Sequence, residues 1–209
     1  MCHIITCPIS RMGKRWIPER YKVDRTVGIS NKMNLKFVVT GGPGGGKTTL
    51  LDSLADRGYR VISESARCII KERLAAGLSP RPDPVSFAQE ILELDIEKYR
   101  TLATGEHPAL FDRGVLDALY MLDAERALPQ GEIASYVERF PYHPVVLLVP
   151  PWEEIYATDS ERDQTFEESV EVFEGMKRWY LQWGYETLEV PRDTIDERVK
   201  SVLQLIKSL

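Results

Sequence analysis

The sequence predicts an α/β fold in which helices cover both faces of a parallel β-sheet. Five short apolar segments alternate with segments of helical periodicity, a pattern typical of right-handed βαβ units. One of them, residues 145–149, is a continuous apolar run between Pro144 and Pro150, as expected of a strand buried on both faces. A length of 209 residues and a hydrophobic content of 43% fit one domain with a sizeable core.

The predicted strands and helices follow one another in alternation. The strands cover residues 35–40, 59–63, 108–111, 145–149 and 185–190. The helices cover a first segment that ends before residue 58, then residues 66–74, 85–104, 115–127 and 131–140, a segment from residue 166, and a last segment after residue 194. Thr194 and Glu197 form a predicted capping box for the last helix. Three prolines assign residues 78–84 to a loop, because proline suits neither a helix interior nor a central strand.

A glycine-rich loop joins the first strand to the first helix. Residues 41–48 read Gly-Gly-Pro-Gly-Gly-Gly-Lys-Thr and match G-x-x-x-x-G-K-[ST], the phosphate-binding P-loop. Glycines allow the backbone N–H groups to bend around a polyphosphate, and the helix N-terminus attracts anions. We therefore expect Lys47 to reach the β- and γ-phosphates of a nucleotide and the Thr48 hydroxyl to bind Mg²⁺. The predicted nucleotide-binding residues here are Gly42, Pro43, Gly44, Gly45, Gly46, Lys47, Thr48 and Thr49.

An acidic residue ends the third predicted strand. Asp112 stands where a carboxylate would hold Mg²⁺ beside the P-loop, and the adjacent Arg113 could touch a phosphate. The alternative is that Asp112 caps the next helix. Asp117 follows five residues later, and we interpret it as part of a solvated helix face.

A second carboxylate closes the second predicted strand. Glu64 would face the acceptor next to the γ-phosphate, where it could accept the proton of an attacking hydroxyl. Arg67, three residues later on the same helix face, could hold a polar or anionic acceptor. The alternative is a simple surface ion pair between these two residues.

Two arginines further along the chain are candidates for the nucleotide site. Arg162 lies in an acidic segment where a mobile lid could bring its charge onto the transferring phosphoryl group; alternatively it neutralises Glu161 or Asp163. Arg192 follows the last strand and could stack on a nucleotide base. The aromatic residues at positions 179, 180, 183 and 185 have helical spacing, so we expect them in the core rather than at a base-stacking site.

The charge is distributed unevenly along the chain. Residues 1–33 carry seven Lys/Arg and two acidic residues, whereas the whole chain has a net charge of −5. We therefore divide it into a basic extension (1–34) and a P-loop domain (35–209), whose acidic character makes nucleic-acid binding unexpected. The extension is a transit-like segment, a nucleic-acid or membrane arm, or translated sequence upstream of a start at Met33.

Cysteine usage and hydropathy indicate the expected compartment. The three cysteines include no C-x-x-C pair, so neither a disulfide framework nor a zinc site is indicated, and the reducing cytoplasm fits best. No apolar run approaches the ~20 residues of a membrane span, so we expect no membrane partner.

Several motifs together resemble a known family. Residues 38–50, Glu64-Ser65-Ala66-Arg67, residues 111–114 and residues 151–162 resemble a family of small predicted ATPases, which is similar to the ribosylnicotinamide kinase-like P-loop kinases. The resemblance covers about residues 35–209 and implies a nucleotide-kinase-like P-loop NTPase fold, a three-layer αβα arrangement with strand order 2-3-1-4-5 that binds ATP and Mg²⁺. Asp112-Arg113-Gly114 looks closer to the Asp/Glu-Arg-Ser of deoxynucleoside kinases, which leaves the acceptor open.

The leading hypothesis is phosphoryl transfer from ATP to a hydroxyl of a small, nucleoside-like metabolite. The predicted catalytic residues are Lys47, Glu64, Asp112, Arg113 and Arg162, and the predicted metal ligands are Thr48 and Asp112. The alternatives are a slowly hydrolysing nucleotide switch with a protein partner and a polynucleotide 5′-hydroxyl kinase. A switch of the GTPase type would need Asn-Lys-x-Asp after the later strands, and a motor ATPase usually has Glu where Arg113 stands. Neither is present in the sequence, which favours a kinase.

Overall fold

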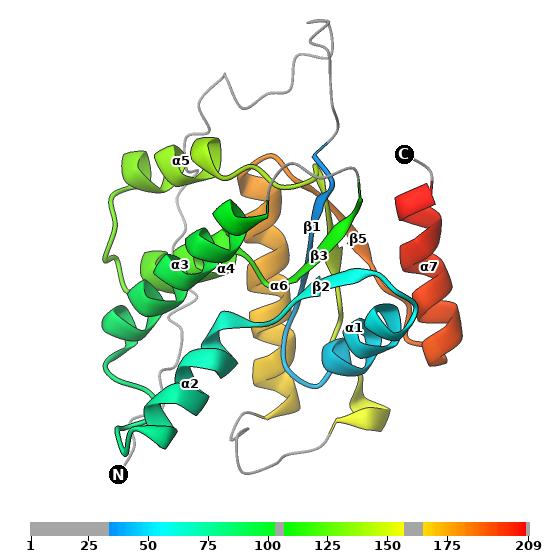
Figure 1. Cartoon of the computed structure of the whole chain (residues 1–209), viewed down its shortest axis with the longest axis horizontal. Helices are drawn as coiled ribbons and strands as arrows, with labels where there is room; N and C mark the ends of the chain where they lie inside the picture. The colour runs from blue at the N-terminus through cyan, green and yellow to red at the C-terminus, as the bar shows by residue number, and fades with distance from the viewer. Residues whose placement is uncertain (1–33, 103–106, 157–164, 208–209) are drawn as a thin grey trace, which may run out of the picture.

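Five parallel strands form one sheet at the centre of the molecule (Figure 1). The computed structural model describes residues 34–102, 107–156 and 165–207. Within these residues the strands are β1 (Lys36–Thr40), β2 (Arg60–Ile62), β3 (Ala109–Asp112), β4 (Val145–Leu148) and β5 (Glu186–Glu189). Their order is β2-β3-β1-β4-β5, and every neighbouring pair is parallel. The predicted strand order is confirmed.

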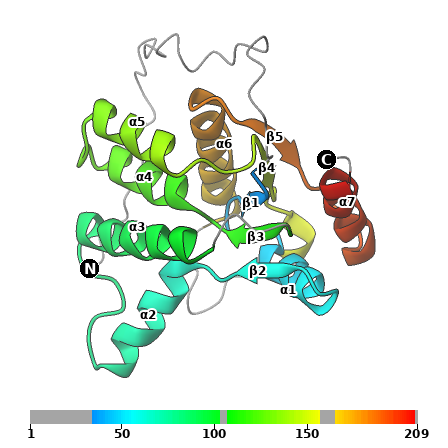
Figure 2. The same cartoon turned by 45° about the horizontal axis from the view of Figure 1, so that its top comes forward.

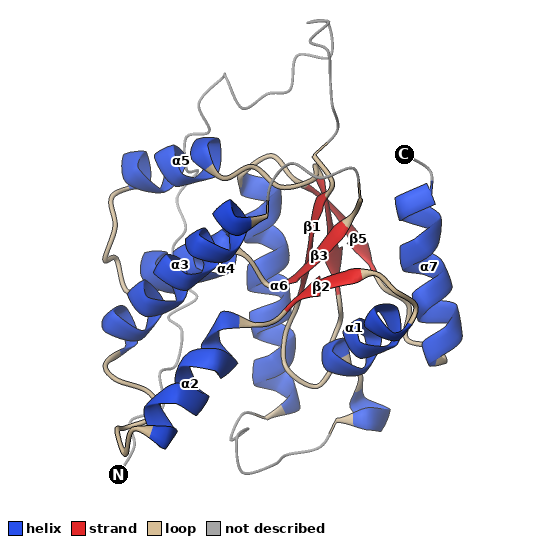
Figure 3. Ribbon diagram, viewed as in Figure 1, coloured by secondary structure: helices blue, strands red, loops and turns tan. Residues whose placement is uncertain are grey.

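Helices cover both faces of this sheet, as predicted (Figures 2 and 3). On one face lie α1 (Lys47–Asp56) and α7 (Ile195–Lys207). The other face carries α3 (Pro84–Thr101), α4 (Val115–Ala124) and α6 (Phe166–Gln182), with α5 (Gln130–Arg139) packed on α4. Directly after β2 comes α2 (Ser65–Ala75), which packs on α3, and the short 3-10 turn η2 (Glu153–Ile155) follows β4.

The central strand β1 connects the two hydrophobic cores. Phe37 and Val39 pack with α1 and α7, whereas Val38 points to the opposite core under α3, α4 and α6. All three side chains are fully buried, as the alternation of side chains in a strand between two layers requires. The P-loop that follows β1 therefore starts from a strand fixed on both faces.

The aromatic residues at the end of α6 lie in the core, as predicted. Trp179 and Trp183 form an edge-to-face pair with ring centroids 5.7 Å apart, and Tyr180 packs in the same way on Tyr185 at 5.6 Å. All four belong to the core between the sheet and α6. Their spacing thus serves packing of the helix and not base stacking.

Helix α3 begins earlier than the sequence indicated. Pro84 was assigned to a loop, but it occupies the first turn of α3, and the Asp83 carboxylate accepts a hydrogen bond from the Ser86 N–H at 3.0 Å. Proline is tolerated in the first turn because its missing N–H would have no helical partner there. Helix α3 ends at Thr101, and residues 103 and 104, at the predicted end of this helix, are not among the described residues.

The predicted capping box of the last helix is only half formed. The Thr194 hydroxyl accepts a hydrogen bond from the Glu197 N–H at 3.4 Å. The Thr194 N–H, however, donates to the Asp193 carboxylate at 2.6 Å, and Glu197 pairs with Lys200 at 3.1 Å. The Asp193 carboxylate thus accepts the hydrogen bond that the capping-box pattern assigns to Glu197.

Among the described residues, no helix combines the length and the apolar character that crossing a membrane requires. Residues 1–33, which make up nearly all of the predicted extension, lie outside the described part of the chain. Asn34 adjoins β1, and its amide nitrogen donates to the Pro141 carbonyl.

Candidate active site

The P-loop runs from the end of β1 to the start of α1. Three of its glycines have a positive φ, a backbone that favours glycine: 146° at Gly41, 80° at Gly44 and 70° at Gly46. A Cβ at Gly44 would also lie 2.1 Å from the Tyr156 ring. Gly46 precedes Lys47, the first residue of α1, so the loop delivers this lysine at a helix N-terminus. Such an N-terminus is suited to hold an anion.

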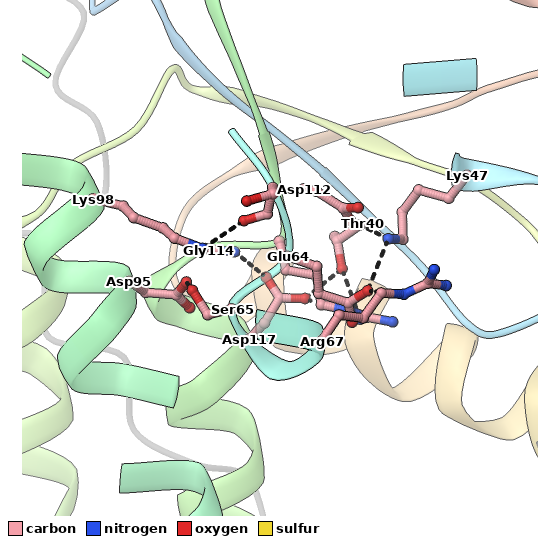
Figure 4. Close-up of polar contacts among 12 residues, drawn as sticks. Thr40, Lys47, Glu64, Ser65, Arg67, Asp95, Lys98, Asp112, Gly114 and Asp117 are labelled. Carbon is pink, nitrogen blue, oxygen red and sulfur yellow. Dashed lines mark hydrogen bonds and ion pairs between the residues drawn. The ribbon is translucent and has the colours of Figure 1, made fainter. Parts of the chain in front are cut away.

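Lys47 brings two predicted site residues together (Figure 4). Its ammonium group donates to a carboxylate oxygen of Asp112, which ends β3, and lies 3.9 Å from a carboxylate oxygen of Glu64, which follows β2. All three side chains are largely buried. The carboxyl ends of neighbouring parallel strands meet at one edge of the sheet, so the fold explains why residues far apart in sequence converge here.

Arg113 faces Glu64, with 25% of its side chain exposed. Its backbone has a φ of 67°, which is uncommon for a residue with a side chain. The guanidinium Nε donates to Glu64 at 3.0 Å, and one terminal nitrogen lies 3.4 Å from Asp117. Arg67 adds a second ion pair to Glu64, also at 3.0 Å. Three cations therefore surround Glu64. Together with Asp112 they form a group that we call the Glu64 cluster: Lys47, Glu64, Arg67, Asp112 and Arg113.

These charges set the ionisation of the Glu64 cluster. Burial alone would raise the pKa of Glu64, but the positive charges of Arg113 and Lys47 outweigh it and lower that pKa to about 2. Burial, together with the nearby Arg113, lowers the pKa of Lys47. The pKa of Asp112 is raised by burial despite the adjacent Lys47. Glu64 thus remains a carboxylate at any pH at which the protein is expected to work.

Asp117 corrects the sequence interpretation. It does not lie on a solvated helix face: it is 3% exposed, and its carboxylate accepts hydrogen bonds from the hydroxyls of Thr40 and Tyr180 and from the Gly114 N–H. The bonds from Tyr180 and Gly114 measure 2.6 and 3.0 Å. Asp117 therefore caps α4, ties it to β1 and α6, and supports Arg113 from behind.

The observed capping also decides between the two alternatives for Asp112. The N–H group at the start of α4 bonds to Asp117, whereas Asp112 contacts Lys47. Asp112 thus faces the P-loop rather than the helix that follows it.

A cavity of about 300 Å³ opens beside the Glu64 cluster. The residues that bear on its chemistry are Thr48, Glu64, Arg67, Cys68, Lys71 and Asp112. Thr48 and Asp112, the predicted metal ligands, lie on the wall towards the P-loop, and α2 forms the other wall. The cavity can therefore admit a polar group between the phosphate loop and Glu64.

The remaining predicted residues are two threonines and two arginines. Thr48 and Thr49 are exposed on the first turn of α1. Arg192 is exposed after β5, and its Nε donates to the Pro151 carbonyl at 2.9 Å, next to the strand end that borders the P-loop. Arg162 lies outside the described residues, so its predicted lid role stays a prediction.

Sequence reasoning missed two residues that contact the P-loop. Tyr156 lies against Gly44, and Arg198 of α7 donates to the Gly45 carbonyl at 2.7 Å. Arg198 is a charged residue of a helix whose Val199 and Val202 are buried in the core. Its proximity to Val199 was the available signal, because neighbours of a buried position on a helix border the same core.

The residues present fit a nucleotide and Mg²⁺. Loop N–H groups and Lys47 suit a polyphosphate, and the Thr48 hydroxyl and Asp112 carboxylate are the oxygen ligands that Mg²⁺ uses with substrate phosphates. Within the described part of the chain, no cluster of three or more His, Cys, Asp or Glu side chains could hold a metal by itself.

Known structures share this fold. A deoxyadenosine kinase from M. mycoides matches with a TM-score of 0.59 at 13% identity over 83% of this chain and all of that one. A NadR protein in complex with NR matches with a TM-score of 0.60 at 16% identity over 83% of this chain but half of that one. Thymidylate kinase from Ehrlichia chaffeensis matches with a TM-score of 0.55 at 13% identity over 84% and 99% of the two chains. At these identities the likeness establishes the fold.

The sequence comparisons give one positive result. No curated protein matches the chain. A family model described as an AAA domain matches residues 36–198, which is most of the chain and includes the P-loop and every member of the Glu64 cluster. The predicted resemblance to P-loop ATPases and to nucleoside and nucleotide kinases is therefore confirmed, and the chain belongs to the AAA domain family.

Proposed function

We propose that this protein is a kinase that transfers the γ-phosphoryl group of ATP to a hydroxyl of a small, nucleoside-like acceptor. One observation carries the proposal: Lys47 of the P-loop contacts Asp112 and approaches Glu64, and these two carboxylates line a cavity of about 300 Å³. This arrangement sets a phosphate-binding cation, a candidate metal ligand and an acceptor-side carboxylate around one space.

The donor side would bind ATP through the P-loop. The loop N–H groups and Lys47 would hold the phosphates, with Thr48 and Asp112 as ligands of Mg²⁺. When bound, Mg²⁺ supplies positive charge that neutralises the phosphate oxygens. Lys47 would exchange its contact with Asp112 for contacts with phosphate oxygens, since both partners of this ion pair gain an opposite charge at the same time.

The acceptor side would orient the hydroxyl at Glu64. A carboxylate with a pKa of about 2 is a weak base, but phosphoryl transfer passes through a loose transition state in which positioning outweighs early proton removal. Arg113 and Arg67 hold both carboxylate oxygens of Glu64 and so fix its direction. Arg162 remains the candidate for a charge on the transferring group.

Two observations favour a kinase over a slow nucleotide switch. The position after Asp112 carries Arg113, which points to Glu64, where a water-polarising carboxylate would be expected in a motor ATPase. The solved structures of similar fold include a deoxyadenosine kinase and a thymidylate kinase, which supports an acceptor of nucleoside or nucleotide type.

The test is acceptor-dependent consumption of ATP with Mg²⁺. The panel contains nucleosides, ribosylnicotinamide, nucleoside monophosphates and 5′-hydroxyl oligonucleotides. Lys47→Ala serves as the blank, Glu64→Gln tests the acceptor side, and Lys200→Ala, at an exposed ion pair of α7, is the matched control. We expect one class of acceptor to stimulate turnover in the wild type and the control only. ATP binding with turnover that no acceptor stimulates would instead support the switch.

A further inference from the structure

Arg198 of α7 lies against the P-loop. It is 4% exposed, and one terminal nitrogen donates to the Gly45 carbonyl at 2.7 Å. The other terminal nitrogen is 2.8 Å from the position that a Cβ would take at Gly46. The C-terminal helix thus places a guanidinium directly against the loop that it follows by some 150 residues.

The charge of Arg198 has no acidic partner within the described part of the chain. Its Nε is buried without a hydrogen-bond partner, and burial is the sole influence that shifts its pKa, which it lowers. By contrast, the more exposed arginines Arg57 and Arg73 pair with carboxylates at 2.8 and 2.9 Å. A buried cation without a counter-charge is unfavourable, which makes its retention next to a phosphate loop informative.

The contact with Gly45 also orients the loop. In a trans peptide the C=O and the following N–H point in opposite directions. The carbonyl of Gly45 is held towards Arg198, so the N–H of Gly46 in the same peptide is turned to the other side of the loop. That is the side from which a P-loop binds phosphate through its N–H groups.

We propose that Arg198 is a positioning residue of the nucleotide site, which fixes the Gly45–Gly46 peptide from behind and provides a buried positive charge that the nucleotide polyphosphate neutralises. The inference rests on the ATP binding of the proposed function and adds a residue from α7 to it. The anion that completes the charge of Arg198 is the triphosphate itself, acting across the loop, where low polarity strengthens the attraction.

The experiment compares Arg198→Met with the wild type and with Lys200→Met, an exposed α7 cation two positions away. Dissociation constants for Mg·ATP and for tripolyphosphate are measured by calorimetry, and each free protein is melted. We expect Arg198→Met to bind both ligands at least tenfold more weakly, and to melt no lower than the wild type, since an unpaired buried charge has been replaced by an apolar side chain. Lys200→Met should bind as the wild type does.

Each outcome decides the matter. Binding by Arg198→Met that is less than tenfold weaker than that of the wild type, whatever its melting temperature, reduces Arg198 to a packing residue and overturns the inference. If that variant does not fold, Arg198→Gln, which keeps a donor for the Gly45 carbonyl but no charge, is judged by the same threshold. A wild type that binds neither ligand overturns the proposed function and this inference with it. If the wild type does bind, the difference in affinity between the two variants tests the inference alone.

Discussion

The Glu64 cluster and the buried carboxylates behind it use charge in different ways (Figure 4). In the cluster, cations and anions face each other beside a cavity, so that a ligand can replace one partner of a pair. Behind it, Asp117 and Asp95 are 3% and 5% exposed and are held by hydroxyl donors from within the protein. The ion pairs of the Glu64 cluster, which a ligand can replace, are thus supported by internal hydrogen bonds that no ligand can reach.

The two buried carboxylates also differ from each other. Asp117 accepts from Thr40, Tyr180 and Gly114 and has Arg113 as a counter-charge. Asp95 accepts from the Ser65 hydroxyl at 2.5 Å, and its second oxygen is buried without a partner. Satisfied carboxylates can stay charged in the interior, whereas unsatisfied ones favour the protonated form.

The largest effect should come from breaking the Glu64 cluster at its exchangeable cation. We expect Lys47→Ala to lower kcat/KM by on the order of 10³-fold or more, because it removes the charge that we propose for holding the phosphates of ATP. Steady-state kinetics with the best acceptor measures this, with circular dichroism as the check on folding. A folded Lys47→Ala protein within tenfold of wild-type activity would place phosphoryl transfer elsewhere.

A smaller loss should follow when the anion at the centre is neutralised. We expect Glu64→Gln to lower kcat about 10²-fold with little change in the KM for ATP, because the acceptor side alone is affected. Since the pKa of Glu64 is lowered to about 2, its protonation should give no acid limb in the wild-type rate profile above about pH 4.

The same lowered pKa makes a prediction about stability. A carboxyl group whose folded pKa lies below its unfolded value stabilises the fold above the unfolded pKa, and this is lost as the pH falls towards the folded value. The wild type should therefore melt above Glu64→Gln at pH 7, and the difference should shrink towards pH 3. A difference that grows on acidification would contradict the ion pairs of Glu64 with Arg113 and Arg67.

The sequence predicted the Glu64 cluster better than the buried residues that support it. Lys47, Asp112 and Glu64 were identifiable because each stands at a strand end or in a local motif, and parallel strand ends must meet. Asp117 was misplaced, because its burial depends on Tyr180, 63 residues later, which no local pattern reveals. Arg198 adjoins the buried Val199, but its role was missed because its partner is a backbone carbonyl of the P-loop 153 residues away in the sequence.

The fold shows the same division. The helix layers were predicted from the alternation of strands and helices, and the strand order from the resemblance to nucleotide-kinase-like P-loop proteins; both predictions were correct. Two errors are at helix starts, where one side chain decides: Asp83 accepts the bond that begins α3 at Pro84, and Asp193 displaces Glu197 from the cap of α7. A third is at a helix end, since the helix predicted over residues 115–127 ends at Ala124. Several residues compete for each end of a helix, so the sequence fixes the element more firmly than its boundary.

A moderate effect should follow from changing Asp117, the buried carboxylate behind the Glu64 cluster. We expect Asp117→Asn to lower kcat about tenfold and to cost about 1–3 kcal/mol of stability, because an amide keeps the shape but loses the charge that faces Arg113 and places an NH₂ group against hydroxyl donors. Tyr180→Phe removes one donor and should show a smaller change in the same direction. Kinetics together with thermal melting separates the two effects; unchanged kcat in a destabilised Asp117→Asn protein would limit Asp117 to a structural role.

The smallest effect should come from Asp95, and it should depend on pH. Burial raises the pKa of Asp95 to about 7, although the hydrogen bond from Ser65 opposes the shift. The folded protein therefore binds a proton there between about pH 4 and 7 that the unfolded chain has released, so this group makes the fold less stable as the pH rises through that range. Asp95→Asn cannot ionise, and its melting temperature should rise relative to the wild type from pH 5.5 to 8.5, while kcat changes less than threefold. A constant difference in melting temperature across this range would mean that Asp95 is charged throughout. Its second oxygen would then have a partner, and Asp95 would resemble Asp117 more than their contacts indicate.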